Sequence, residues 1–137
     1  MTQATPASRP DLDIQDDIQN IIVHYPPLQA DRHQLDVDVR DGEVFISGHV
    51  RSIISRRYLL ERVASVPGVR SVNLDRLYAE ETIRLEVGRL IPTGVIANPY
   101  YGALILTGAL PQGVTAESLA QQVGQIPGVE QVLTKFA

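Results

Sequence analysis

Residues 41–52 read DGEVFISGHVRS, and the pattern of this stretch predicts how the chain folds. Asp41-Gly42 is typical of a hairpin turn, because glycine readily adopts the positive φ that a tight turn needs. Val44 and Ile46 alternate with other residues, which predicts a half-buried strand. A second stretch, YGALILTGALPQ at residues 101–112, carries its glycines and aliphatic residues in the same register. We infer that one strand–glycine–helix unit occurs twice.

Further landmarks support a duplication. Four pairs of identical residues lie sixty positions apart: Gly48 and Gly108, Leu59 and Leu119, Pro67 and Pro127, Gly68 and Gly128. Four matches at one offset indicate an internal repeat. A module of roughly sixty residues buries only about 60% of its unfolded surface and is marginally stable alone. We therefore expect the two modules to pack together.

The first module, residues 11–78, is predicted to have the element order α-β-β-α-β. Its first helix is indicated by isoleucines at helical spacing from Ile14 to Ile22, and Tyr25-Pro26-Pro27 ends it. Strand 35–40, a return strand through Ile46, a helix over 52–65 and a strand over 69–77 follow. Ser52 is the expected N-cap of that helix, with Ser55 as the next candidate.

The second module, residues 79–137, repeats this order. Residues 80–91 favour a helix, although their alternation also permits a strand. Strands 94–97 and 103–107 are expected to form a hairpin across residues 98–102. Thr115 is expected to cap a helix, and Pro127-Gly128 to lead into a last strand through Val132. The predicted class is α+β: two αββαβ modules, each a small three-stranded mixed sheet with two helices on one face. Residues 1–10 are predicted to be a disordered lead-in.

Composition argues against several classes of function. The chain has no cysteine and three scattered histidines, His24, His33 and His49, so we expect no disulfide, no metal site and no cofactor. The phosphate-binding patterns GxGxxG and GxxxxGK[ST] are absent, and no paired acid and base are apparent, so we do not expect an enzyme. A net charge of −4 and the absence of a GxxG loop disfavour nucleic-acid binding.

The chain resembles the BON domain family, bacterial modules found in osmotically induced and transport-associated proteins. The resemblance rests on DGEVFISGHVRS, on Arg56 and Leu59 at the family's spacing, and on VPGVRSVN at residues 66–73. The second module matches through LILTGAL and IPGVEQV but lacks the Asp-Gly turn, so it resembles a divergent copy. The resemblance implies the αββαβ fold and attachment to phospholipid or to cell-envelope surfaces.

Charge is unevenly distributed along the first module. Residues 51–70 contain five arginines and one acid, whereas residues 11–43 contain nine acids and two arginines. One interpretation is a surface for anionic lipid, with isoleucines beside the basic side chains. The alternative is that the arginines pair with the acidic first helix. The candidate lipid- or partner-binding residues are Arg51, Ile53, Ile54, Arg56, Arg57, Arg62 and Arg70.

Two further pairs of residues are candidates for contact surfaces. If Val44 and Ile46 face the helices, Phe45 must face the other way, and Ile105 does the same in the second module. We expect these open sheet faces to pack on each other or on a second subunit, the alternative being a groove for lipid or a partner. Tyr100 and Tyr101 are expected at a turn tip, either at a membrane or protein contact or folded back onto the neighbouring module.

These features together favour a non-enzymatic tandem binding module that associates with anionic phospholipid surfaces. The alternatives are a scaffold that self-associates, as a homo-oligomer or with another protein, and a sensor of a small ion or ligand. The sequence shows neither a signal-peptide pattern nor a transmembrane segment, so the expected location is the cytoplasm, either free or peripheral to a membrane.

Overall fold

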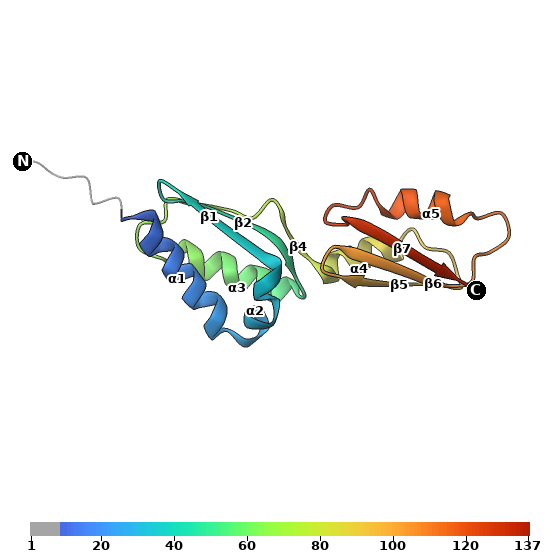
Figure 1. Ribbon diagram of the computed structural model, residues 1–137, viewed down its shortest axis with the longest axis horizontal. Helices are drawn as coiled ribbons and strands as arrows, with labels where there is room; N and C mark the ends of the chain where they lie inside the picture. Colours follow the sequence, from blue (N-terminus) through green and yellow to red (C-terminus); the bar gives the residue numbers. More distant parts are fainter. Residues whose placement is uncertain (1–8) are drawn as a thin grey trace, which may run out of the picture.

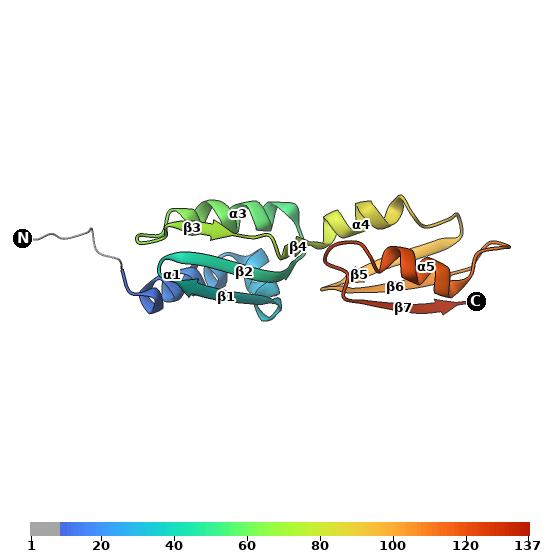
Figure 2. The same ribbon diagram turned by 90° about the horizontal axis from the view of Figure 1, so that it is seen from above.

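The computed structural model describes residues 9–137 and contains two small sheets, each with its own helices (Figure 1). The two units lie end to end in both views, which gives the chain an elongated shape (Figures 1 and 2). The α+β class with two small mixed sheets is confirmed. Most of the predicted lead-in, residues 1–8, lies outside the described residues. Arg9 is placed, and its guanidinium binds Asp17 at 2.6 Å.

The first module is built from helices α1 and α3 on one face of a four-stranded sheet. As predicted, helix α1 ends before the Pro-Pro pair, because Tyr25 is extended, but the prolines then start a short helix that the sequence pattern missed. Proline suits the first turn of a helix, where its missing N–H has no partner to lose. The elements are α1 (Asp11–His24), α2 (Pro26–Asp31), a 3₁₀ turn (Arg32–Gln34), β1 (Leu35–Arg40), β2 (Glu43–Val50), α3 (Ile53–Ala64), β3 (Ser71–Asn73) and β4 (Leu77–Ala79).

The last strand of the first module is interrupted, where the sequence predicts one strand over residues 69–77. Strand β3 pairs in parallel with the start of β2, and β4 pairs with the end of β2. Between them the Asn73 side chain accepts a hydrogen bond from the backbone N–H of Asp75, which turns the chain out of the sheet. The N–H of Gly48 donates to the carbonyl of Arg76 across this interruption.

The second module has the same plan with a shorter first helix. Its elements are α4 (Glu80–Gly88), β5 (Val95–Tyr100), β6 (Ala103–Gly108), α5 (Ala116–Val123) and β7 (Gln131–Phe136). Residues 80–88 are helical, which resolves the ambiguity there. The predicted five-residue turn is wrong: β5 runs through Pro99 to Tyr100, and the turn consists of Tyr101 and Gly102 alone. Pro99 is tolerated because β5 is an edge strand.

The duplication is visible residue by residue in the strand pairing. Leu35 pairs with Gly48 and Val95 with Gly108, and every pair in the first hairpin has a counterpart sixty positions later. Both glycines have positive φ, and a Cβ at either would approach a carbonyl oxygen to about 2 Å (1.9 Å at Gly48 and 2.1 Å at Gly108). The glycine is therefore required at this position in both copies for the same steric reason.

Each module closes its own hydrophobic core. Ile14, Leu59 and their neighbours form one buried cluster, and Ile83 and Leu119 belong to a second. The expectation that the open sheet faces carrying Phe45 and Ile105 pack on each other is wrong, because the modules meet at their ends (Figures 1 and 2). Phe45 is instead half-buried against its neighbour Arg40, whose guanidinium lies 5.4 Å from the ring centroid.

Candidate functional site

The predicted arginine surface is divided among separate structural roles. Arg56 donates from Nε to the carbonyl of Leu77 and from Nη2 to that of Leu74, both at 3.0 Å. It thereby holds the interruption between β3 and β4 against α3. Arg62 lies over the Tyr58 ring at 5.4 Å. The hydrogen bonds of Arg56 occupy N–H groups that a lipid headgroup would need, whereas the ring contact leaves Arg62 exposed.

The alternative, pairing with the acidic first helix, is not observed in the described part of the chain. Among residues 9–137 no ion pair joins any of the five arginines to α1. Two acids of α1 have other partners: Asp17 binds Arg9, and Asp11 accepts hydrogen bonds from the N–H groups of Asp41 and Gly42. Asp11 thus fixes the hairpin turn to the start of α1.

What remains exposed near the arginines is one side of α3. Ile54 is 66% exposed, and Ile53 and Leu60 are also exposed around Arg57. Arg70 is exposed as well, but it lies beyond the other end of α3. The candidates Ile53, Ile54 and Arg57 therefore share a surface, whereas Arg70 does not belong to it.

Tyr101 and Arg51 meet at the junction between the modules. The Tyr101 hydroxyl donates to Asp31 Oδ1 at 2.7 Å, and Arg51 Nε donates to the same hydroxyl oxygen at 3.0 Å. Desolvation is the main cause that raises the pKa of Tyr101 above its ordinary value, with the hydrogen bond to Asp31 second. The hydrogen bond from Arg51 to Tyr101 raises the pKa of Arg51. Of the two alternatives for Tyr101, the structure shows the turn contacting the neighbouring module.

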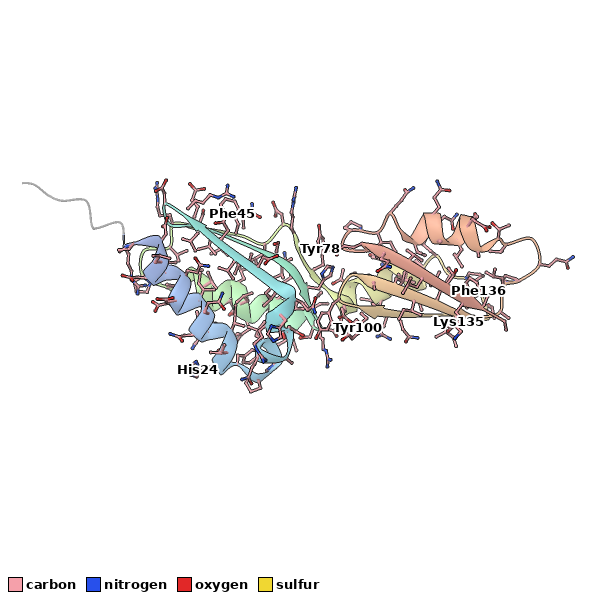
Figure 3. All side chains as sticks on the ribbon, in the orientation of Figure 1. His24, Phe45, Tyr78, Tyr100, Lys135 and Phe136 are labelled. Atoms are coloured by element: carbon pink, nitrogen blue, oxygen red, sulfur yellow. The ribbon has the colours of Figure 1, made fainter. Side chains whose placement is uncertain are left out.

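Three residues at the junction escaped the sequence prediction. Asp31 has no exposed surface, and His49 is only 3% exposed. His49 Nε2 donates to the carbonyl of Gly128 at 2.7 Å. Figure 3 shows Tyr78 at the same junction, where it packs against Gly128 so closely that a Cβ there would lie 2.7 Å from the ring. Only the sixty-residue offset of the repeat, which makes Tyr101-Gly102 equivalent to Asp41-Gly42, could have identified this turn.

The open faces of the two sheets differ although their backbones match. In the first sheet the outward positions of β1 and the start of β2 hold Asp36, Asp38, Arg40 and Glu43. Sixty positions later the same four positions hold Ile96, Asn98, Tyr100 and Ala103. Every charged side chain of this set is thus replaced by an uncharged one.

An apolar patch results on the second sheet, which we call the second open face. It consists of outward residues from all three strands: Ile96, Tyr100, Ala103, Ile105 and Leu133. Ile96 is 57%, Tyr100 62% and Leu133 45% exposed, and Ile105 pairs directly with Leu133. Asn73 stands where Leu133 would be in the first module, so this apolar side chain is also specific to the second.

Residues 9–137 contain no group of three or more metal-ligating side chains. None of the helices described there combines the length and the apolar character needed to cross a bilayer.

Comparison with known proteins supports the fold and the family. The chain aligns with the C-terminal domain of CdsD, described as the structural protein of the type III secretion system of Chlamydia trachomatis, with 23% identity and a TM-score of 0.69. The alignment covers 94% of this chain and 66% of that one. A second CdsD structure from the same organism aligns with 17% identity, a TM-score of 0.38, and coverage of 90% and 91% of the two chains. No curated protein matches.

The sequence comparison places the family in the first module. The BON domain matches residues 10–77, which span α1 to the start of β4. The chain therefore belongs to the BON domain family, through a BON domain in its first module that is followed by a structurally repeated, divergent second module.

Proposed function

We propose that the chain is a non-catalytic assembly module that self-associates through the second open face, with a second copy of the chain as the partner. The likeness in fold to a domain of a secretion-system structural protein supports a structural role. The stronger support comes from the chain itself, because the two modules form an internal comparison.

The main support is that outward strand positions carry different residue types in the two modules. A sheet with one solvated face normally carries polar residues there, as Asp36 and Asp38 show in the first module. The same backbone in the second module carries Ile96, Ile105 and Leu133. The fold does not require Ile96 or Leu133, because the first module has Asp36 and Asn73 at these positions, whereas Ile105 corresponds to Phe45 and is apolar in both modules. Burial against another surface is what they favour.

The second copy is the occupant that the chemistry of this face fits. The five residues of the patch are uncharged, and the one charge beside them on the three described strands, Lys135, lies on the row of Ile96 and Thr107 at one end of the face. Two copies of the patch can therefore meet in the self-complementary way that a two-fold symmetric contact requires. Two such sheets can pack face to face about 10 Å apart, with the apolar side chains interdigitating. Phe45 does not extend this patch, because acids and arginine surround it on the first sheet.

The size of the face predicts a weak contact. Three strands about 4.8 Å apart and six residues long, at about 3.3 Å per residue, cover roughly 300 Å². A stable interface buries about 800 Å² on each partner. Association through this face alone should therefore be detectable only at high protein concentration and should become strong only where many copies are held together.

Sedimentation velocity over a range of concentrations tests this function. The double variant Ile96→Asp/Leu133→Asn places the first module's residues on the second sheet, so the fold should tolerate it and self-association should be lost. Ile54→Asp is the matched control, because it introduces the same charge at an equally exposed isoleucine on another surface. A parent chain that stays monomeric at high concentration, or a double variant that associates like the parent, would contradict the proposal.

Membrane attachment is a second candidate, favoured by the exposed isoleucines around Arg57 on α3. Co-sedimentation with phosphatidylglycerol vesicles measures it, and binding should fade with salt because exposed charges are screened. Arg57→Glu combined with Ile54→Asp should abolish binding. Arg56 is a poor target, because its replacement would disturb the fold. Vesicle binding that survives in the Arg57→Glu/Ile54→Asp variant would show that α3 is not the membrane surface.

A further inference from the structure

The turn that carries Tyr101 adopts a conformation that a tyrosine does not favour. Tyr101 has φ of 46°, and Asp41 at the same position in the first module has φ of 51°. Aspartate tolerates this left-handed region because its short side chain can hydrogen-bond locally, whereas a bulky side chain is uncommon there. Contacts made by the tyrosine must therefore offset the strain.

Those contacts join the two modules. The Tyr101 hydroxyl reaches Asp31 at the end of α2, and Arg51 after β2 donates to the same hydroxyl. On its own side, the Tyr101 N–H donates to Glu80 Oε1 at 2.8 Å. In the first module Asp11 accepts the backbone N–H of Asp41 in the corresponding turn, so the bond from Tyr101 to Glu80 is common to both modules. The hydrogen bond from the Tyr101 hydroxyl to Asp31 is specific to the second turn.

Asp31 depends on this arrangement. Its carboxylate is fully buried. It accepts a hydrogen bond from the backbone N–H of Arg51 at Oδ2 and one from the Tyr101 hydroxyl at Oδ1, and Oδ1 lies 4.0 Å from Nε of the Arg51 side chain. A buried charge is costly unless it is hydrogen-bonded. If the modules separated, Asp31 would lose its bond from Tyr101, so the closed arrangement is favoured.

The shape of the contact is equally specific. A Cβ at Gly102 would lie 2.8 Å from Cε1 of the His49 ring. Gly128 makes room for Tyr78 and accepts from His49. Two glycines of the repeat thus receive two side chains at the end of the first module.

The receiving residues are not part of the repeat. Sixty positions after Asp31, His49 and Arg51 stand Ile91, Ala109 and Pro111, which cannot make these hydrogen bonds. The far end of the second module therefore cannot accept another module in the same way. The contact is a joint that this chain makes once.

We propose that Asp31, Arg51 and Tyr101 form a latch that holds the two modules in one fixed orientation, and that the Tyr101 hydroxyl is the group that closes it. When the latch opens, the modules can reorient about the short connection between β4 and α4, whose bounds adjoin at residues 79 and 80, against the His49–Gly128 hydrogen bond and the two backbone N–H bonds that join Glu81 to Arg51 and Ile53. This inference does not depend on self-association.

Distance measurements between two spin labels test the latch in the full chain. The sequence has no cysteine, so Glu61→Cys on α3 and Gln121→Cys on α5 give one exposed label site in each module. Electron–electron double resonance should show one narrow distance distribution for the parent. Tyr101→Phe removes only the hydroxyl, and Tyr100→Phe is the control at an exposed neighbour. The measurement is made at low protein concentration on the Ile96→Asp/Leu133→Asn background, which separates it from self-association.

Tyr101→Phe should broaden the distribution by raising the population of unlatched conformers about tenfold, the change that 1.4 kcal/mol produces. Tyr100→Phe should leave it narrow. A narrow and unshifted distribution in Tyr101→Phe would overturn the proposal, as would a parent distribution that is already broad. Asp31→Asn is the second variant: it should also broaden the distribution, while circular dichroism confirms that both modules stay folded.

Discussion

Replacing Gly108 by alanine should selectively unfold the second module. Gly108 has φ of +98°, and an added Cβ would lie 2.1 Å from the carbonyl oxygen of Gly94. Real Cβ contacts are not shorter than 3.0 Å, so the start of β5 would have to move by roughly 1 Å and the pairing of Val95 with Gly108 would break. We expect a loss of about 3–5 kcal/mol, combining left-handed strain with a clash against backbone.

Gly113 supplies the matched control in the same module. Its φ is +88°, but nothing lies within 4 Å of its added Cβ. Gly113→Ala therefore experiences the left-handed strain without the clash and should cost only about 1–2 kcal/mol. The difference between the two variants isolates the close approach of the two strands.

Hydrogen exchange followed by mass spectrometry is the suitable assay. A module of this size is stable by roughly 3–9 kcal/mol, so the loss at Gly108 is comparable with its whole stability. Because the cores are separate, amides of the second module should lose protection, whereas those of the first keep it except at the joint. Equal destabilisation by Gly108→Ala and Gly113→Ala would refute the steric argument, and equal loss of protection in both modules would refute the separate cores.

Three further outcomes are expected. Arg56→Ala should lower the free energy of unfolding by about 2–3 kcal/mol, because two carbonyls lose a charged donor, whereas exposed Arg57→Ala should change it by less than about 0.5 kcal/mol in urea titrations. Ser52→Ala removes the acceptor for the Ser55 N–H and should cost about 1 kcal/mol, measured by thermal unfolding. The pKa of Tyr101 is raised in the folded chain, so its neutral hydroxyl stabilises the joint below about pH 10 and that contribution is lost as the pH rises through the folded value. Distance distributions should broaden in that alkaline range in the parent, and a Tyr101→Phe variant showing the same transition would contradict this assignment.

The sequence was sufficient for the elements whose pattern is local. Ser52 caps α3 and Thr115 caps α5 as predicted, because a hydroxyl before a helical stripe satisfies a free N–H wherever it occurs. The turn at Tyr101 was harder, since tyrosine and proline argue against a tight hairpin extending through Pro99. Pairing with β6 sets the end of β5: the two strands adopt the same register as β1 and β2 in the first module, and this tertiary constraint overrides the local preference.

Contacts across the chain could not be predicted in the same way. Asp31 lies in a stretch that gave no periodic signal, and its role follows from residues distant in sequence: Arg51, twenty residues away, and Tyr101, seventy residues away, both donate to it. The arginine cluster shows the converse. Its composition suggested one basic surface, but α3 directs Arg56 toward the carbonyls of Leu74 and Leu77 while Arg70 lies beyond the helix. Clustering in sequence therefore did not give clustering in space.

A duplicated fold allows structural requirements to be separated from acquired ones. Gly48 and Gly108 are identical because an equivalent carbonyl approaches each of them, that of Gln34 in the first module and that of Gly94 in the second, so their identity reflects the fold. Asp36 and Ile96 occupy equivalent outward positions where the fold imposes no choice, and they differ in charge. The joint adds a third category, residues that connect one copy to the other. Arg51 belongs to it: Pro111 stands at the equivalent position of the second module, and Arg51 contacts Tyr101 at one end of the first. Function in this chain is therefore expected where the copies disagree: on the second open face and at the latch.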